Sequence, residues 1–156
     1  MNVITRTGVT AIQRNITVKW IKRCLREITR KHYELPVDYA AARSAIAITV
    51  KLAGHRSSAC GRGVTIDVTA FSKSQTSLIE YPAFKHDPVI GSVEQMSPEL
   101  ALAGTIAHEV SHFVQYRYGP HTRWLRNRYQ KPHGEGFQDI YRILRSRIVN
   151  PHLGSD

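Results

Sequence analysis

Cysteine is scarce in this sequence, with Cys24 and Cys60 as its two examples in 156 residues. Two cysteines exclude a disulfide framework and a zinc site built from cysteine alone. Long apolar runs are missing as well, because no stretch approaches the roughly 18 uninterrupted apolar residues that a membrane helix requires. The first residues, Met1 to Arg6, become polar too early for the apolar region of a signal peptide. We therefore expect a cytoplasmic protein without a membrane partner.

Acidic residues are also few. Twelve Asp and Glu stand against 22 Lys and Arg, which gives a formal net charge of +10. The excess of positive charge points to an anionic partner, although net charge says nothing about the fold. Since 42% of the residues are hydrophobic, the chain can bury a core, and its length fits one compact domain. We expect a single domain over residues 1–156, with a folded core at about 10–150.

Hydrophobic periodicity predicts the first elements. Apolar residues at spacings of three and four predict an amphipathic helix over residues 11–32. Two runs rich in β-branched residues, 45–50 and 64–68, predict strands, and the Gly- and Ser-rich stretch 54–63 between them predicts a turn. A weaker strand candidate lies at 88–93.

Two further helices follow. Ser97 before a proline predicts the start of a helix that continues to Gly119. A last helix is expected from near Gly134 to Asn150. The predicted order is an N-terminal helix, a small mixed or antiparallel sheet, a second helix and a C-terminal helix, which is an α+β fold.

One short motif carries most of the chemical information: His108-Glu109-Val110-Ser111-His112. On a helix, residues four apart lie on the same face, so both histidines can bind one metal ion. Zinc accepts neutral imidazole nitrogen, and its catalytic sites combine three protein ligands with a water molecule. Glu109 follows the first histidine, where its carboxylate can take a proton from that water. The motif therefore predicts one Zn²⁺ ion and hydrolysis of a peptide bond.

The third metal ligand must come from elsewhere in the chain. The metzincin pattern is absent, because Gln115 occupies the position three residues after His112 where that pattern has glycine. The downstream candidates are His121, His133, Glu135 and Asp139. The most informative stretch is His-Gly-Glu-Gly-Phe, which runs from His133 to Phe137.

Together, the two motifs resemble those of the SprT-like zinc metallopeptidases, which include the Spartan proteases of DNA–protein crosslink repair. That family follows its His-Glu-x-x-His helix with a His-Gly-x-x-Phe-like element that opens a later helix. The resemblance covers about residues 10–150 and implies a zincin-like fold. It implies His108, His112 and His133 as zinc ligands and Glu109 as the general base. No cysteine follows Cys60, so the C-terminal zinc ribbon of longer relatives has no counterpart in this sequence.

The resemblance also implies where a substrate lies. In zincins the peptide adds as a strand along the sheet edge beside the active-site helix. By this resemblance, the segment 88–93 is expected to provide that edge.

Glu135 and Asp139 support a different ligand assignment. Their spacing resembles the gluzincin element, in which a glutamate is the third ligand and an aspartate orients a ligand histidine. Under that assignment His133 is an ordinary surface residue, whereas Asp139 could orient an imidazole under either one. Because a His-Gly start followed by Phe137 fits the SprT-like pattern better, we expect His133 rather than Glu135 as the third ligand.

A basic and aromatic segment, residues 116–131, separates two of the proposed ligands. Cations interleaved with flat aromatic rings hold phosphates and stack on exposed bases. The residues expected to contact nucleic acid are Arg117, Arg123, Trp124, Arg126, Arg128 and Lys131. The predicted first helix has a similar basic face, so DNA is an expected partner beside a protein or peptide substrate.

A zinc-dependent metallopeptidase is the function that the sequence favours, with DNA-associated proteins as one class of substrate. A second interpretation is a basic nucleic-acid-binding module whose zinc site is structural or vestigial. It predicts four protein ligands, with His121 or Asp139 as the fourth. A third interpretation is a metallohydrolase that cleaves cell-wall peptide amides.

Overall fold

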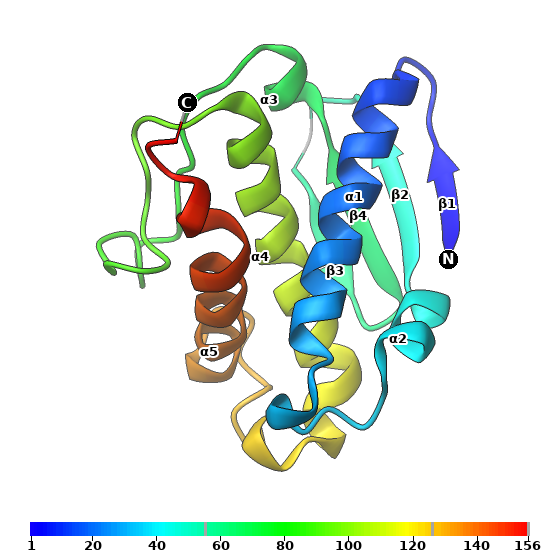
Figure 1. The fold of residues 1–156 in the computed structure, drawn as a ribbon, viewed down its shortest axis with the longest axis vertical. Helices are drawn as coiled ribbons and strands as arrows, with labels where there is room; N and C mark the ends of the chain where they lie inside the picture. Colours follow the sequence, from blue (N-terminus) through cyan, green and yellow to red (C-terminus); the bar gives the residue numbers. More distant parts are fainter. Residues whose placement is uncertain (55, 126, 156) are drawn as a thin grey trace.

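A computed structural model describes residues 1–54, 56–125 and 127–155 of the chain (Figure 1). Its helices and strands are, in chain order, β1 (Asn2–Thr5), α1 (Ala11–Ile28), α2 (Tyr39–Ala45), β2 (Ala47–Lys51), β3 (Ser58–Cys60), β4 (Gly63–Asp67), α3 (Thr69–Ser72), α4 (Pro98–Tyr118) and α5 (Glu135–Leu144). Short 3₁₀ turns lie at 31–33, 119–121, 123–125 and 150–152, and a π-helical turn lies at 145–149. The fold is α+β, which confirms the predicted class.

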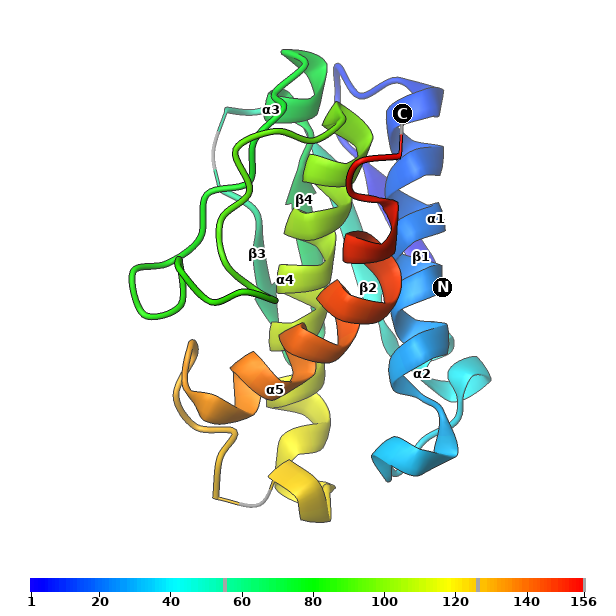
Figure 2. The same cartoon turned by 60° about the vertical axis from the view of Figure 1, so that its left-hand side comes forward.

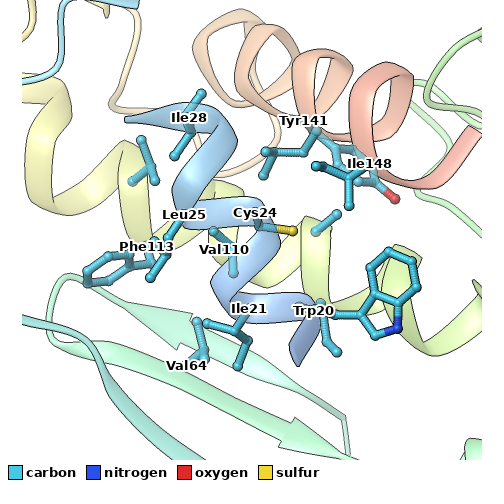
Figure 3. Close-up of a cluster of buried hydrophobic side chains, with 14 of the residues drawn as sticks. Trp20, Ile21, Cys24, Leu25, Ile28, Val64, Val110, Phe113, Tyr141 and Ile148 are labelled. Carbon is cyan, nitrogen blue, oxygen red and sulfur yellow. The ribbon is translucent and has the colours of Figure 1, made fainter. Parts of the chain in front are cut away.

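The strands of the described residues form a four-stranded mixed sheet in the order β1-β2-β4-β3. The central strand β2 pairs in parallel with β1 and β4, and β3 pairs antiparallel with β4. Ile48 and Val50 of β2 stand in register with Val64 and Ile66 of β4, and all four side chains are buried. These residues alternate with partly exposed ones, as expected for a sheet with one covered face. Helices pack on that face, and Figure 3 shows Ile21 of α1 beside Val64.

Helix α1 begins where its sequence supplies a capping box. The Thr10 hydroxyl accepts the backbone N–H of Gln13, and the Gln13 side chain accepts the N–H of Thr10. The apolar stripe predicted for this helix is buried from Trp20 to Ile28, and Figure 3 shows this part between the sheet and the C-terminal helix. At the start of the helix, Ile12 is exposed. The helix ends at Ile28 rather than at residue 32, because the Thr29 hydroxyl bonds to the Leu25 carbonyl and Arg30 adopts an extended conformation.

Helix α4 runs through the middle of the molecule and carries the His-Glu-x-x-His motif. Ser97 caps it by accepting the N–H of Leu100, and Pro98 occupies its first turn, as the sequence predicts. Glu99 in this first turn accepts a hydrogen bond from the Trp20 indole at 2.9 Å and pairs with Lys19, which ties α4 to α1. Most of α4 is buried, since it contacts α1, α5, β3 and β4. This position holds the motif rigidly against the sheet.

Several predicted elements differ from the observed ones. The strand β1 precedes the first helix, and β3 lies inside the stretch 54–63 that was expected to be a turn. The prediction of a strand at 88–93 is wrong, because these residues form turns with an isolated bridge between Leu78 and Val93. The cause is Asp87, whose carboxylate accepts the N–H groups of Val89 and Ile90 and so curls the backbone.

The segment between α3 and α4, residues 73–97, projects from the body of the molecule in Figure 2. Residues near the end of the chain anchor it. Arg142 pairs with Asp87 at 2.8 Å, and the Asn150 amide donates to the Val89 carbonyl at 2.8 Å. Arg145 donates to the carbonyl of Gly91 at 3.2 Å. These bonds hold the segment in place beside α4, where it contributes to the site described below.

None of the helices in the described part of the chain combines the length and apolar character needed to cross a membrane.

Candidate metal centre

Three histidines from two helical regions converge at one point. His108 and His112 are one helical turn apart on α4, and His133 immediately precedes the N-cap of α5. The Nε2 atom of His133 lies 3.2 Å from Nε2 of His108 and 3.0 Å from Nε2 of His112. Metal-ligating atoms of all three residues lie within 4.8 Å of one another. The three histidines could therefore hold a single metal ion.

The spacing of these nitrogens suits a zinc-sized ion. In a tetrahedral site with zinc–nitrogen bonds of about 2.0–2.1 Å, two ligand nitrogens stand about 3.3–3.4 Å apart. The observed separations of 3.0 and 3.2 Å are close to that value. Histidine donors without a fourth protein ligand are typical of catalytic rather than structural zinc sites. The donor set therefore fits the cofactor that the sequence predicts.

Glu80 orients the imidazole of His108, the first of the three histidines. Its Oε2 atom lies 3.4 Å from Nδ1 of His108, while Oε1 accepts hydrogen bonds from the Tyr141 hydroxyl and from Arg145 at 3.5 Å. An Nδ1–H that points at a carboxylate leaves Nε2 unprotonated and free to bind metal. The side chains of Glu80 and Arg145 are almost completely buried, so bulk water solvates neither charged group. The sequence did not reveal Glu80, because it lies in an irregular segment where a lone acid has no diagnostic spacing.

Gln115 performs the corresponding role for the second ligand. Its Oε1 atom lies 3.2 Å from Nδ1 of His112, and its Nε2 atom donates to the carbonyl of Lys131 at 2.5 Å. One buried amide therefore orients His112 and also ties α4 to the loop that carries His133. The residue that excludes the metzincin pattern thus has a structural function of its own.

Aromatic rings enclose the three imidazoles. Phe137 packs against each of them, with ring centroids 4.3 Å from His112, 4.8 Å from His108 and 5.1 Å from His133. Tyr81 stacks on His133 with centroids 3.7 Å apart. Gly136 makes this packing possible, because a Cβ atom there would lie 2.0 Å from the carbonyl oxygen of Arg128.

Burial keeps two of the histidines neutral. Burial, reinforced by the neighbouring His108, lowers the pKa of His112 to about 3 and the pKa of His133 to about 4. Both rings are therefore unprotonated at physiological pH, which is the form that binds metal. His112 and His133 therefore do not have to lose a proton when an ion enters.

Glu109 lines a pocket of about 410 Å³ together with His108. The other lining residues are Arg56, Ser57, Leu78, Ile79, Glu80, Tyr81, Pro82 and Thr105. Burial raises the pKa of Glu109 to about 7. A carboxyl group with a pKa near the working pH can both accept and return a proton.

The other acidic candidates point elsewhere. The Glu135 side chain is 84% exposed and lies 3.6 Å from Nε of Arg128. Asp139 pairs with Arg128 at 2.5 Å and with Arg142 at 3.4 Å, so it orients neither His108 nor His112. Among the residues that the structure describes, the metal-ligating group at this site contains the three histidines and no carboxylate.

The residues expected to contact nucleic acid have mixed surroundings. Arg123 and Lys131 are exposed, and the exposed Arg117 donates to the Gly61 carbonyl at 3.0 Å. Trp124 is half-buried and stacks with Tyr33. The carboxylates of Glu135 and Asp139 compensate the charge of Arg128 within the chain. Arg126 lies outside the described residues.

The basic face of α1 is also partly engaged. Lys19 pairs with Glu99, and Arg30, two residues beyond the end of the helix, pairs with Glu27 at 3.0 Å. The guanidinium of Arg23 stands 4.4 Å from the ring centroid of Trp20. Nucleic-acid contact through this helix and the 116–131 segment stays a prediction.

Comparison of the chain with protein-family models, with curated proteins and with solved structures gives no match.

Proposed function

We propose that this chain is a zinc-dependent metallopeptidase of the SprT-like type, with zinc held by His108, His112 and His133. The observation that carries the proposal is the convergence of three Nε2 atoms, since one of these histidines, His108, lines a pocket together with Glu109. A metal site that is enclosed by the hydrophobic core and has no access for a substrate would be structural. This one faces a pocket large enough for a ligand, since pockets that bind small ligands span about 300–1,000 Å³.

Each residue of the site has a role in this proposal. When bound, zinc supplies a Lewis acid that polarises the scissile carbonyl and lowers the pKa of a water molecule. Glu109 takes the proton of the attacking water and returns it to the leaving amine. Glu80 and Gln115 hold the imidazoles in the tautomer that exposes Nε2. Phe137 keeps water away from the inner side of the three rings.

The substrate in this proposal binds along β3 rather than along residues 88–93. Strand β3 is an antiparallel edge strand of the sheet, and it packs against α4. Arg56 and Ser57, which lead into β3, line the pocket beside His108 and Glu109. An extended peptide can add to such an edge through backbone hydrogen bonds, which brings its carbonyl groups past the histidines.

The interpretation as a structural zinc site receives less support. It requires a fourth protein ligand, and its candidate Asp139 is engaged by Arg128 and Arg142. His121 lies in the 3₁₀ turn after α4 and is exposed. The described residues around the three histidines offer no other ligand.

The substitution Glu109→Gln tests the proposal, because it keeps the shape of the side chain and removes the base. We expect the variant to retain zinc and to lose casein hydrolysis by at least about a hundredfold. Glu94→Gln, at an exposed position in the 73–97 segment, is the matched control and should cleave like the wild type. Hydrolysis at the wild-type rate by Glu109→Gln would refute the proposed mechanism.

A further inference from the structure

The pocket beside the metal centre has two walls and a floor that differ in character. Its floor is α4, through Thr105, His108 and Glu109. Residues 78–82 form one wall, and Arg56 and Ser57 form the other. The first wall belongs to the 73–97 segment that projects in Figure 2. If the chain is the proposed peptidase, a pocket that His108 and Glu109 line is available to the side chain of a substrate residue next to the scissile bond.

The wall formed by residues 78–82 is apolar and exposed. Ile79 is 74% exposed and Tyr81 is 41% exposed. They are two of the four large hydrophobic residues that stand exposed in the described part of the chain, and both line this pocket. Apolar side chains that gather at one exposed place mark a binding surface, whereas scattered ones do not. The wall is suited to contact an apolar group.

Gly104 lets this wall lie directly on the floor of the pocket. A Cβ atom at position 104 would stand 2.5 Å from Cδ2 of Leu78. Without that atom, Leu78 packs against α4 and is only 7% exposed. The contact between residues 78–82 and α4 at this end of the pocket is consequently apolar.

Two carboxyl groups and one guanidinium line the pocket, those of Glu80, Glu109 and Arg56. Glu109 is the base of the proposed reaction, so Glu80 and Arg56 are the charges considered for a substrate side chain. Glu80 lines the pocket, but its carboxylate is occupied by Tyr141, Arg145 and His108, and its side chain is only 2% exposed. Arg56, which also lines the pocket, is exposed. A lysine or arginine that entered the pocket would face this guanidinium, and like charges at close range lower affinity.

From these features we propose that the pocket binds a large apolar side chain, branched or aromatic, on the substrate residue beside the scissile bond, and that it discriminates against lysine and arginine. This inference rests on the proposed peptidase function and names the class of substrate for the same site. An apolar pocket separates large from small side chains by about tenfold to two-hundredfold in kcat/KM.

A set of matched fluorogenic peptides tests this specificity. The peptides differ only in the residue on one side of the scissile bond, which is Phe, Leu, Ala or Lys, and the full zinc-loaded chain is the enzyme. We expect kcat/KM for Phe and Leu to exceed that for Ala by at least about tenfold, with Lys lowest. Values within about threefold of one another, or a preference for Lys, would overturn the proposal.

Two variants link the preference to this pocket. Ile79→Ser should lower the ratio of kcat/KM between the Phe and Ala peptides, because it removes part of the apolar wall. Ile12→Ser is the matched control, since Ile12 is 70% exposed but lies on α1 outside the pocket. Arg56→Glu should raise kcat/KM for the Lys peptide relative to the Phe peptide. If Ile79→Ser and Ile12→Ser show the same ratio of kcat/KM between the Phe and Ala peptides, this pocket is not the source of the apolar preference.

A binding measurement separates this inference from the proposed function. The same peptides are titrated against zinc-loaded Glu109→Gln, and their Kd values are compared. Tighter binding of Phe and Leu peptides without cleavage by the wild type would support the pocket and refute the peptidase activity. Cleavage by the wild type with equal Kd values for all four peptides would support the activity and refute the pocket.

Discussion

Oε2 of Glu80 lies 3.4 Å from Nδ1 of His108, although Glu80 belongs to the irregular 73–97 segment and His108 to α4. The other oxygen of Glu80 accepts hydrogen bonds from Tyr141 of α5 and from Arg145 in the π-helical turn that follows. Arg145 is 1% exposed and also donates to the Gly91 carbonyl. The orientation of His108 on α4 therefore depends on the 73–97 segment and on the C-terminal helix together.

We predict that Glu80→Gln weakens zinc binding by about tenfold to one-hundredfold, because residues that orient metal ligands have effects of this size. Competition with a chromophoric chelator measures the affinity, and ¹⁵N NMR of the imidazoles reports the tautomer of His108 without metal. Asp87→Asn is the control, since it loosens the same segment without touching His108. An unchanged affinity and an unchanged tautomer in Glu80→Gln would show that Glu80 serves only packing.

We predict a similar but smaller effect for Gln115→Met, which keeps the volume of the side chain and removes both of its hydrogen bonds. Zinc affinity should fall by about tenfold. The backbone amides of residues 131–133 should exchange faster with solvent, because the bond to the Lys131 carbonyl is lost. Amide hydrogen exchange and chelator competition check the two effects separately. If zinc affinity falls while the amides of residues 131–133 still exchange slowly, Gln115 orients His112 but does not stabilise the loop.

The sequence predicts the histidines of the candidate site better than it predicts the residues that orient them. Ser97 and Pro98 define the start of α4 locally, so the limits of this helix and the shared face of His108 and His112 follow from the sequence. Glu80 could not be found in this way, because its partner His108 is distant in the chain and the intervening residues have no periodicity. Strand β3 was missed for a related reason, since only its pairing with β4 makes a Gly- and Ser-rich stretch extended.

The expected strand at 88–93 shows how one side chain can override propensity. The Asp87 carboxylate accepts the N–H of Ile90, and also that of Val89, and bonds to Arg142. These bonds lower the pKa of Asp87 from 3.8 to about 2. Since the folded-state pKa is depressed, Asp87 stabilises the fold above about pH 4, and this contribution is lost as the pH falls towards 2.

We therefore predict that Asp87→Asn lowers the free energy of unfolding by about 1–2 kcal/mol at pH 7 and by much less at pH 2.5. Urea unfolding at the two pH values measures the difference. Glu94→Gln, which changes an exposed acid of the same segment, should have little effect at either pH. A loss of stability in Asp87→Asn that is equal at both pH values would contradict the assigned role of the carboxylate.

We predict that removal of metal leaves the fold intact. The core is apolar and continuous from α1 to α5, so it does not require an ion (Figure 3). Zinc at about a hundred times its Kd should add about 2.7 kcal/mol of stability, which corresponds to a rise in Tm of about 5–10 °C. Circular dichroism with chelator and thermal melts with and without zinc measure the two effects. His112→Ala should show no zinc-dependent rise in Tm, and unfolding by chelator would instead indicate a structural zinc site.

Zinc stoichiometry by equilibrium dialysis tests the central claim most directly, when the wild type is compared with His133→Ala and Glu135→Ala. The geometry predicts one zinc ion per chain in the wild type and in Glu135→Ala, and a large loss of affinity in His133→Ala. Retention of tightly bound zinc by His133→Ala, together with its loss from Glu135→Ala, would contradict the three-histidine site.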